Sequence, residues 1–98
     1  MKLWEVFLAR VPFEDLPEEK VRPVLILAEG NGFVECIKMT SKPPRGGEYP
    51  LRFWGESGLK KPTTVRVSKV LRLKATSFIK RIGRLSIADI VEIQRLLS

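Results

Sequence analysis

The chain has 98 residues, of which 44% are hydrophobic, and this is enough to fold as one domain around one hydrophobic core. The formal net charge is +7, with one cysteine and no histidine. These counts exclude an intrachain disulfide, histidine-ligated metal centres and Ser-His or Cys-His catalysis, so acid–base chemistry must fall to carboxylates, hydroxyls, Lys, Tyr or Arg.

The first half of the chain predicts three strands. Residues 4–11 form the first strand, and residues 13–20 form an acidic loop. Residues 21–28 form a second strand, whose nearly continuous apolar run indicates burial on both faces. A tight turn over residues 29–32 favours positive φ and leads into a third strand over residues 33–40. Because the single cysteine lies in this apolar third strand, we expect a buried, unreactive thiol and a reducing compartment.

The second half begins with a break in regular structure. Residues 41–47 contain two prolines, two glycines and two basic residues, which predicts an exposed basic loop. A short strand over residues 49–53 and a helical turn over residues 54–59 follow. Residues 63–67 and 70–73 predict two further strands or edge pieces.

The end of the chain predicts a helix that docks on a sheet. Ser86 and Asp89 have the spacing of a capping box, with aspartate in place of the usual Glu or Gln. Several short strands with one terminal helix indicate a mainly β domain with the shape of a small barrel, spanning residues 1–98. The helix is expected to present one apolar stripe to the core: Ile87, Ile90, Val91, Ile93, Leu96 and Leu97.

The positive charge is concentrated in the second half of the chain. Residues 1–50 carry seven Lys/Arg and eight Asp/Glu, whereas residues 51–98 carry eleven and three. A one-sided positive field attracts phosphate polymers such as nucleic acids. Solubility alone, or an acidic protein partner, would explain the same asymmetry.

Two strand ends carry candidate phosphate-binding side chains. Arg22 begins the second strand, and its planar guanidinium suits bidentate contact with a phosphate and stabilisation of charge on phosphorus. An ion pair with Glu18 or Glu19 is the alternative. Thr40 and Ser41 end the third strand, where their hydroxyls could bind a phosphate oxygen or serve only the turn.

A third candidate is Arg66, which shares the polar face of a predicted strand with Thr64 and Ser68. A solvated strand edge is the alternative. Loop cations suit contact with a nucleic-acid backbone, and these are Lys42, Arg45, Lys60 and Lys61.

Other side chains have weaker signals. Tyr49, Phe53 and Trp54 could stack on unpaired bases, although most aromatic residues in a small domain belong to the core. The basic residues that flank Gly83, over residues 80–84, are expected in a solvated loop.

Four segments in order resemble the MazF/PemK family of toxins from bacterial toxin–antitoxin pairs. They are KVRPVLIL at 20–27, IKMTS at 37–41, GLKKPTTVR at 58–66 and IGRLS at 82–86. The likeness extends over residues 3–97. It implies an SH3-like barrel, a homodimer and an endoribonuclease for single-stranded RNA, in which the 2′-hydroxyl of the RNA attacks the adjacent phosphate.

The resemblance also implies roles for individual residues. Arg22 would stabilise the transition state and serve as the acid, Thr40 would bind the phosphate, and Arg66 would be a second phosphate or acid group. Glu18 or Glu19 is the nearest match to an acidic residue of the family. Some members carry an aspartate two residues after the second arginine, where this chain has a serine.

The leading hypothesis is therefore a metal-independent endoribonuclease toxin without cofactors, neutralised by an acidic antitoxin that lies across the RNA-binding surface. We expect a cytoplasmic protein, because no apolar run approaches the length of a membrane span and no signal peptide is evident. The alternatives are a non-catalytic SH3-like module that binds nucleic acid or an acidic peptide, and a purely structural interaction protein.

Overall fold

A computed structural model describes residues 1–13 and 15–98. Within these residues the chain forms strands, two short 3-10 helices and one α-helix. The elements are β1 (Glu5–Pro12), β2 (Glu19–Gly30), β3 (Phe33–Thr40), β4 (Tyr49–Pro50), η1 (Gly55–Ser57), β5 (Thr64–Lys74), η2 (Ala75–Ser77), β6 (Phe78–Arg84) and α1 (Ile87–Leu97).

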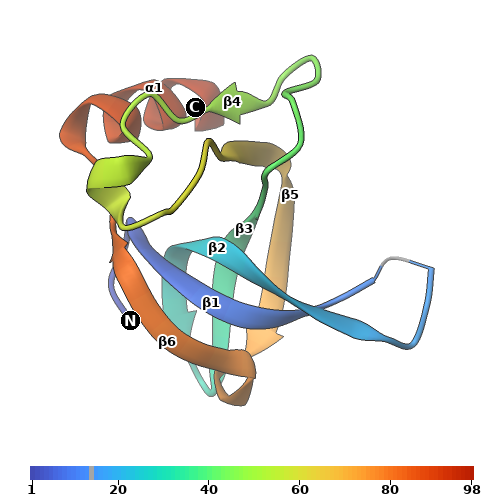
Figure 1. Cartoon of the computed structure of the whole chain (residues 1–98). Helices are drawn as coiled ribbons and strands as arrows, with labels where there is room; N and C mark the ends of the chain where they lie inside the picture. Colours follow the sequence, from blue (N-terminus) through green and yellow to red (C-terminus); the bar gives the residue numbers. More distant parts are fainter. Residues whose placement is uncertain (14) are drawn as a thin grey trace.

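The strands form one antiparallel sheet in the order β4-β5-β3-β2-β1-β6. The sheet curls, with α1 and β4 at one end, while the ends of β1 and β2 extend away from the rest of the sheet (Figure 1). This architecture confirms the predicted mainly β fold with a C-terminal helix.

Both faces of the central strands are buried, as predicted. Val24 and Ile26 of β2 pack in one apolar cluster with Cys36. Leu25, between them, belongs to a second cluster with Ile37 of β3 and with residues of α1. Because neighbouring strand residues point to opposite faces, this arrangement explains the continuous apolar run. Burial raises the pKa of the Cys36 thiol to about 12, which suits an unreactive side chain.

The turn between β2 and β3 has the predicted backbone. Asn31 and Gly32 both have positive φ, 49° and 79°, as a two-residue hairpin turn requires. The strand that follows begins and ends at the predicted residues, 33 and 40. The acidic loop predicted over residues 13–20, between β1 and β2, is shorter than predicted, because Glu19 and Lys20 already pair with β1.

In the second half, pairing with β3 changes the predicted boundaries. The two predicted strands over 63–67 and 70–73 form one continuous strand, β5, because β3 pairs along both parts of it through a register shift between Ile37 and Met39. The strand predicted over 49–53 is limited to Tyr49–Pro50. The helical turn predicted over 54–59 is confirmed as η1.

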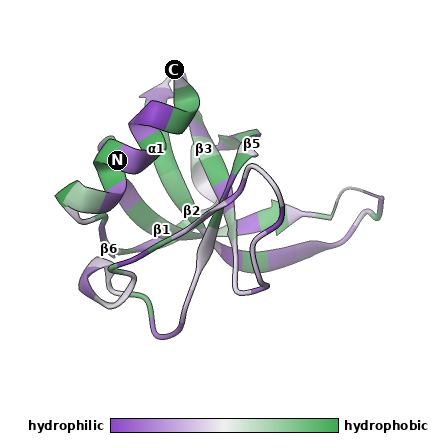
Figure 2. Cartoon of the chain, turned by 90° about the horizontal axis from the view of Figure 1, so that it is seen from above, coloured by the Kyte–Doolittle hydropathy of each residue, from purple (hydrophilic) through white to green (hydrophobic). Residues whose placement is uncertain are grey.

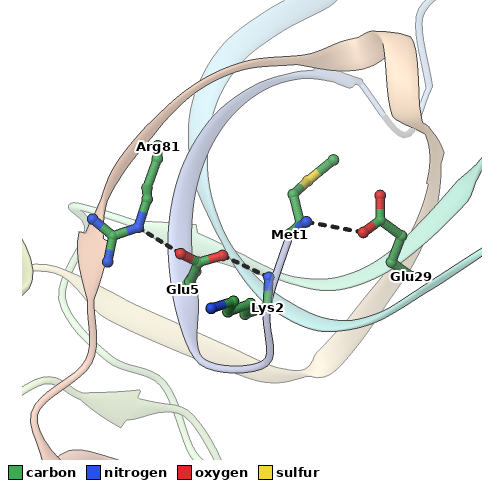
Figure 3. A network of polar contacts seen from close by, with 5 residues as sticks. All are labelled: Met1, Lys2, Glu5, Glu29 and Arg81. Carbon is green, nitrogen blue, oxygen red and sulfur yellow. Dashed lines mark hydrogen bonds and ion pairs between the residues drawn. The ribbon is translucent and has the colours of Figure 1, made fainter.

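The prediction of a solvated basic loop over 80–84 is wrong. These residues belong to β6, which pairs with β1. Arg81 Nε donates to Glu5 Oε2 at 2.5 Å across this strand pair (Figure 3). The backbone N–H of Lys2, and then Arg81, lower the pKa of the Glu5 carboxyl. At Gly83 a Cβ atom would lie 2.3 Å from the carbonyl oxygen of Ser57, so this close approach requires glycine.

The capping of α1 is confirmed, but its predicted stripe is only partly buried. The Ser86 hydroxyl accepts a hydrogen bond from the Asp89 N–H. Ile90 and Ile93 are buried, whereas Ile87 is 78% exposed. The helix alternates hydrophobic and hydrophilic segments (Figure 2), and only its middle turns contact the core. The other stripe residues that the prediction placed in the core, and that are exposed, are Val91, Leu96 and Leu97.

Candidate functional site

Strand register brings three predicted site residues to one surface. The β2–β3 ladder begins at the pair Val24–Lys38, and Arg22 and Thr40 lie two residues beyond it on their strands. Both side chains line the same two pockets. Arg66 lies in β5, on the other side of β3. The polar side chains at positions 22, 40 and 66, predicted separately, thus belong to neighbouring strands.

Two adjoining pockets meet at this point and form one groove. The first has a volume of about 310 Å³ and the second about 590 Å³. Arg22 and Thr40 line both pockets, and Arg66 lines the first. We call this continuous surface the groove.

The groove is strongly positive. Basic side chains line both pockets, while the described residues of the second pocket include no carboxylate. A concave, cationic surface concentrates phosphate polymers. The basic residues that line the groove are Lys20, Arg22, Lys38, Lys42, Lys60, Lys61, Arg66 and Lys80.

Arg22 is half-buried in the groove. The sequence left open whether Arg22 is available to a phosphate or forms an ion pair with Glu18 or Glu19. Among the described residues, Arg22 forms no such ion pair. The backbone of Arg22 is fixed opposite Ala9 of β1. A guanidinium held without a carboxylate partner keeps its N–H donors for an anionic ligand.

Thr40 occupies the end of β3 at the centre of the groove. Its Oγ1 accepts a hydrogen bond from the backbone N–H of Lys42 at 3.2 Å. This contact uses the hydroxyl as an acceptor, so its hydrogen remains available to a ligand oxygen. Ser41 lines the second pocket beside it.

Arg66 lines the groove and forms an ion pair with Glu48, which the sequence did not predict. Its Nε donates to Glu48 Oε2 at 2.9 Å, and the other carboxylate oxygen accepts from the Arg45 backbone N–H at 3.0 Å. These two donors, the Arg45 N–H first, lower the pKa of Glu48. A third, smaller recess contains this pair together with Thr40 and Lys42.

Five other predicted site residues do not line the groove. Arg45 lines only the third, smaller recess. Thr64 is 4% exposed in the sheet between β3 and β4, so its side chain does not reach the surface. Ser68, Glu18 and Glu19 are exposed but lie outside the lining.

The three aromatic residues singled out as stacking surfaces also lie outside the groove lining. Trp54 and Tyr49 pack against the core, and the Tyr49 hydroxyl donates to Asp89 at 2.6 Å. Phe53 is 39% exposed near Arg52. An aromatic side chain that does line the groove is Phe13, for which no sequence pattern predicted a role.

The structure also adds charged residues to the groove. Lys38 precedes Thr40 by two, and Lys20 precedes Arg22 by two, so the alternation of strand side chains is a signal that could have revealed both. The position of Lys80 in the groove could be predicted only from the pairing of β6 with β1. Asp15 provides a carboxylate to the first pocket, from the loop between β1 and β2.

The described residues contain neither a cluster suited to a metal ion nor a helix suited to spanning a membrane. No cluster of three or more Cys, Asp or Glu side chains in residues 1–13 and 15–98 is arranged to hold a metal ion. Across the same residues, no helix has the length and apolar character needed to cross a bilayer.

Comparison with known proteins identifies a family. Residues 2–98 match the family described as the PemK-like, MazF-like toxin of type II toxin–antitoxin systems. No curated protein matches the chain.

Solved structures with the same fold are also similar to this chain. The Mycobacterium tuberculosis toxin MazF-mt6 has a TM-score of 0.74 at 21% identity, over 95% of this chain and 91% of that one. An endoribonuclease in complex with its cognate antitoxin, from Mycobacterial species, has a TM-score of 0.75 at 14% identity, over 97% and 88%. Another endoribonuclease from Mycobacterial species has a TM-score of 0.74 at 14% identity, over 98% and 86%.

Proposed function

The chain belongs to the PemK-like, MazF-like toxins of type II toxin–antitoxin systems, and on this premise we propose that it is a metal-independent endoribonuclease for single-stranded RNA. The observation that carries the proposal is the cationic groove, in which Arg22, free of any described carboxylate partner, and Thr40 line the same two pockets. We propose that the protein acts in the bacterial cytoplasm as a homodimer.

The reaction needs no group from outside the protein and its substrate. The 2′-oxygen of the RNA forms a bond to the adjacent phosphorus, and the bond to the 5′-oxygen breaks, which leaves a 2′,3′-cyclic phosphate and a 5′-hydroxyl. Arg22 would donate N–H bonds to the non-bridging oxygens, where negative charge develops, and Thr40 would donate its hydroxyl hydrogen to the same phosphate.

Proton transfer requires an acceptor for the 2′-hydroxyl and a donor for the leaving oxygen. Glu18 and Glu19 remain predictions from the resemblance. Asp15 is a further carboxylate with a place in the groove lining beside Arg22 and Arg66. We assign Asp15 the role of proton acceptor from the 2′-hydroxyl, Arg22 that of proton donor to the leaving 5′-oxygen, and Arg66 a second contact with the phosphate.

Cleavage in the presence of a chelator is the direct test. The purified protein should cut a long single-stranded RNA in EDTA, and end mapping should find cyclic phosphates and 5′-hydroxyls. Intact RNA after long incubation, combined with binding that weakens as salt increases, would instead favour a non-catalytic module.

An acidic antitoxin segment should compete with RNA for the groove, because both ligands are polyanions and the groove provides one cationic surface. We expect displacement of a labelled, non-cleavable 2′-deoxy oligonucleotide as the antitoxin peptide is added. A scrambled peptide of equal charge is the control for non-specific attraction. Simultaneous binding of both ligands would contradict a shared site.

A further inference from the structure

The contact between Glu48 and Arg66 has a specific geometry. Arg66 uses its Nε atom, at 2.9 Å from Glu48 Oε2. A guanidinium has two further nitrogens, which carry four N–H donors. No described residue hydrogen-bonds to them, so the ion pair fixes the side chain and leaves its terminal donors to the groove.

Glu48 is itself held from two sides. One oxygen accepts from the Arg45 backbone N–H and the other from Arg66, and its side chain is only 11% exposed. The pKa of Glu48 is lowered by these donors. A carboxylate with both oxygens occupied and a lowered pKa is a weak proton acceptor, so its chemistry is orientation and not general-base catalysis.

The same carboxylate connects a loop and a strand beside the groove. Arg45 belongs to the basic loop after β3, whereas Arg66 belongs to β5, so Glu48 joins loop and strand. The small recess that these residues line also contains Thr40 and Lys42, beside the proposed phosphate position. Position 68, two residues after Arg66 on the same strand, is an exposed serine and so provides no carboxylate for Arg66.

We propose that Glu48 is a positioning residue, which holds Arg66 so that its terminal nitrogens face the phosphate bound at Thr40. The inference rests on the proposed function for the identity of the ligand as RNA. The pose of Arg66 is a property of the free protein and does not depend on that function.

The kinetic test uses three variants. Glu48→Gln preserves the shape but removes the charge, and one amide oxygen cannot serve both donors. We expect kcat to fall about tenfold, because a small displacement of a catalytic group has effects of this order or larger, while KM stays unchanged or falls as the groove becomes more positive. In an Arg66→Ala background, Glu48→Gln should cause no further loss, because both changes remove one interaction.

A matched control separates position from charge. Glu56→Gln removes the same charge from an exposed residue of η1 outside the groove lining, and its kcat should equal that of the unaltered protein. Thermal unfolding of each variant establishes that it is folded. Unchanged or increased kcat in Glu48→Gln, or additive losses in the double variant, would overturn the proposal.

A second measurement does not require cleavage. In the ¹⁵N-labelled protein without RNA, the Arg66 Nε–H should exchange slowly with solvent, and Glu48→Gln should make this exchange fast while Glu56→Gln leaves it unchanged. The signal is assigned by its disappearance in Arg66→Ala. If the unaltered protein fails to cleave RNA, the proposed function fails, but this measurement still decides whether Glu48 holds Arg66. Equal exchange in Glu48→Gln and the unaltered protein would refute the inference.

Discussion

Replacing Arg22 by alanine should lower the rate of RNA cleavage by at least about 10²-fold, the usual effect of removing one donor to a developing oxyanion. The Arg22 guanidinium lies where both groove pockets meet and has no carboxylate partner among the described residues. Its removal therefore leaves no buried charge unpaired, and the free energy of unfolding should change by less than about 1 kcal/mol. Single-turnover cleavage and chemical denaturation measure the two quantities.

Two further variants test this interpretation of Arg22. Arg22→Lys preserves the charge but loses the planar, bidentate donor set. Compared with Arg22→Ala, it should therefore recover more of the RNA binding than of the catalytic rate. Arg72→Ala removes an equal charge from an exposed residue of β5 that lies over the Phe33 ring, outside the groove lining, and should cleave normally. Undiminished cleavage by Arg22→Ala would show that the catalytic site lies elsewhere.

The largest loss of stability is expected from Asp89→Ala. The Asp89 carboxylate is fully buried and accepts hydrogen bonds from the Tyr49 hydroxyl at 2.6 Å, and from the backbone N–H groups of Arg52 and Phe53 at 3.0 Å. Alanine would leave these donors without an acceptor. Since each unsatisfied buried donor costs about 1–3 kcal/mol, the total loss should be about 3 kcal/mol or more.

This loss is large relative to the typical stability of about 5–15 kcal/mol for a small domain. Urea denaturation should show a lower midpoint with an unchanged slope. Asp89→Asn keeps one acceptor oxygen, so its free energy of unfolding should fall less than that of Asp89→Ala. Tyr49→Phe removes only one donor and should lower the free energy of unfolding by about 1 kcal/mol. An unchanged midpoint in Asp89→Ala would contradict the role of this carboxylate. Because the bonded backbone directly follows β4, the loss should also loosen the segment that carries Glu48.

Local patterns in the sequence were sufficient for several elements of the fold. The Asn31-Gly32 turn, the limits of β3 and the Ser86 cap depend on residues that are neighbours in the chain. The apolar run of β2 likewise indicated burial on both faces. The ordered motifs identified the family, which the match over residues 2–98 confirms.

Contacts between distant residues were accessible only from the tertiary structure. Glu48 and Arg66 are 18 residues apart, and Asp89 is 40 residues from Tyr49. The sequence revealed Asp89 only as part of a helix cap, because its other partners come from a different element.

The sequence by itself thus determined the fold class, the family and the residue types that can hold a phosphate. The tertiary structure decided which of them meet: it brought Arg22 and Thr40 to one groove, buried Thr64 in the sheet and placed the basic segment 80–84 in a strand. The physical reason is that side-chain periodicity is a local property, whereas strand register depends on pairing between segments far apart in the chain.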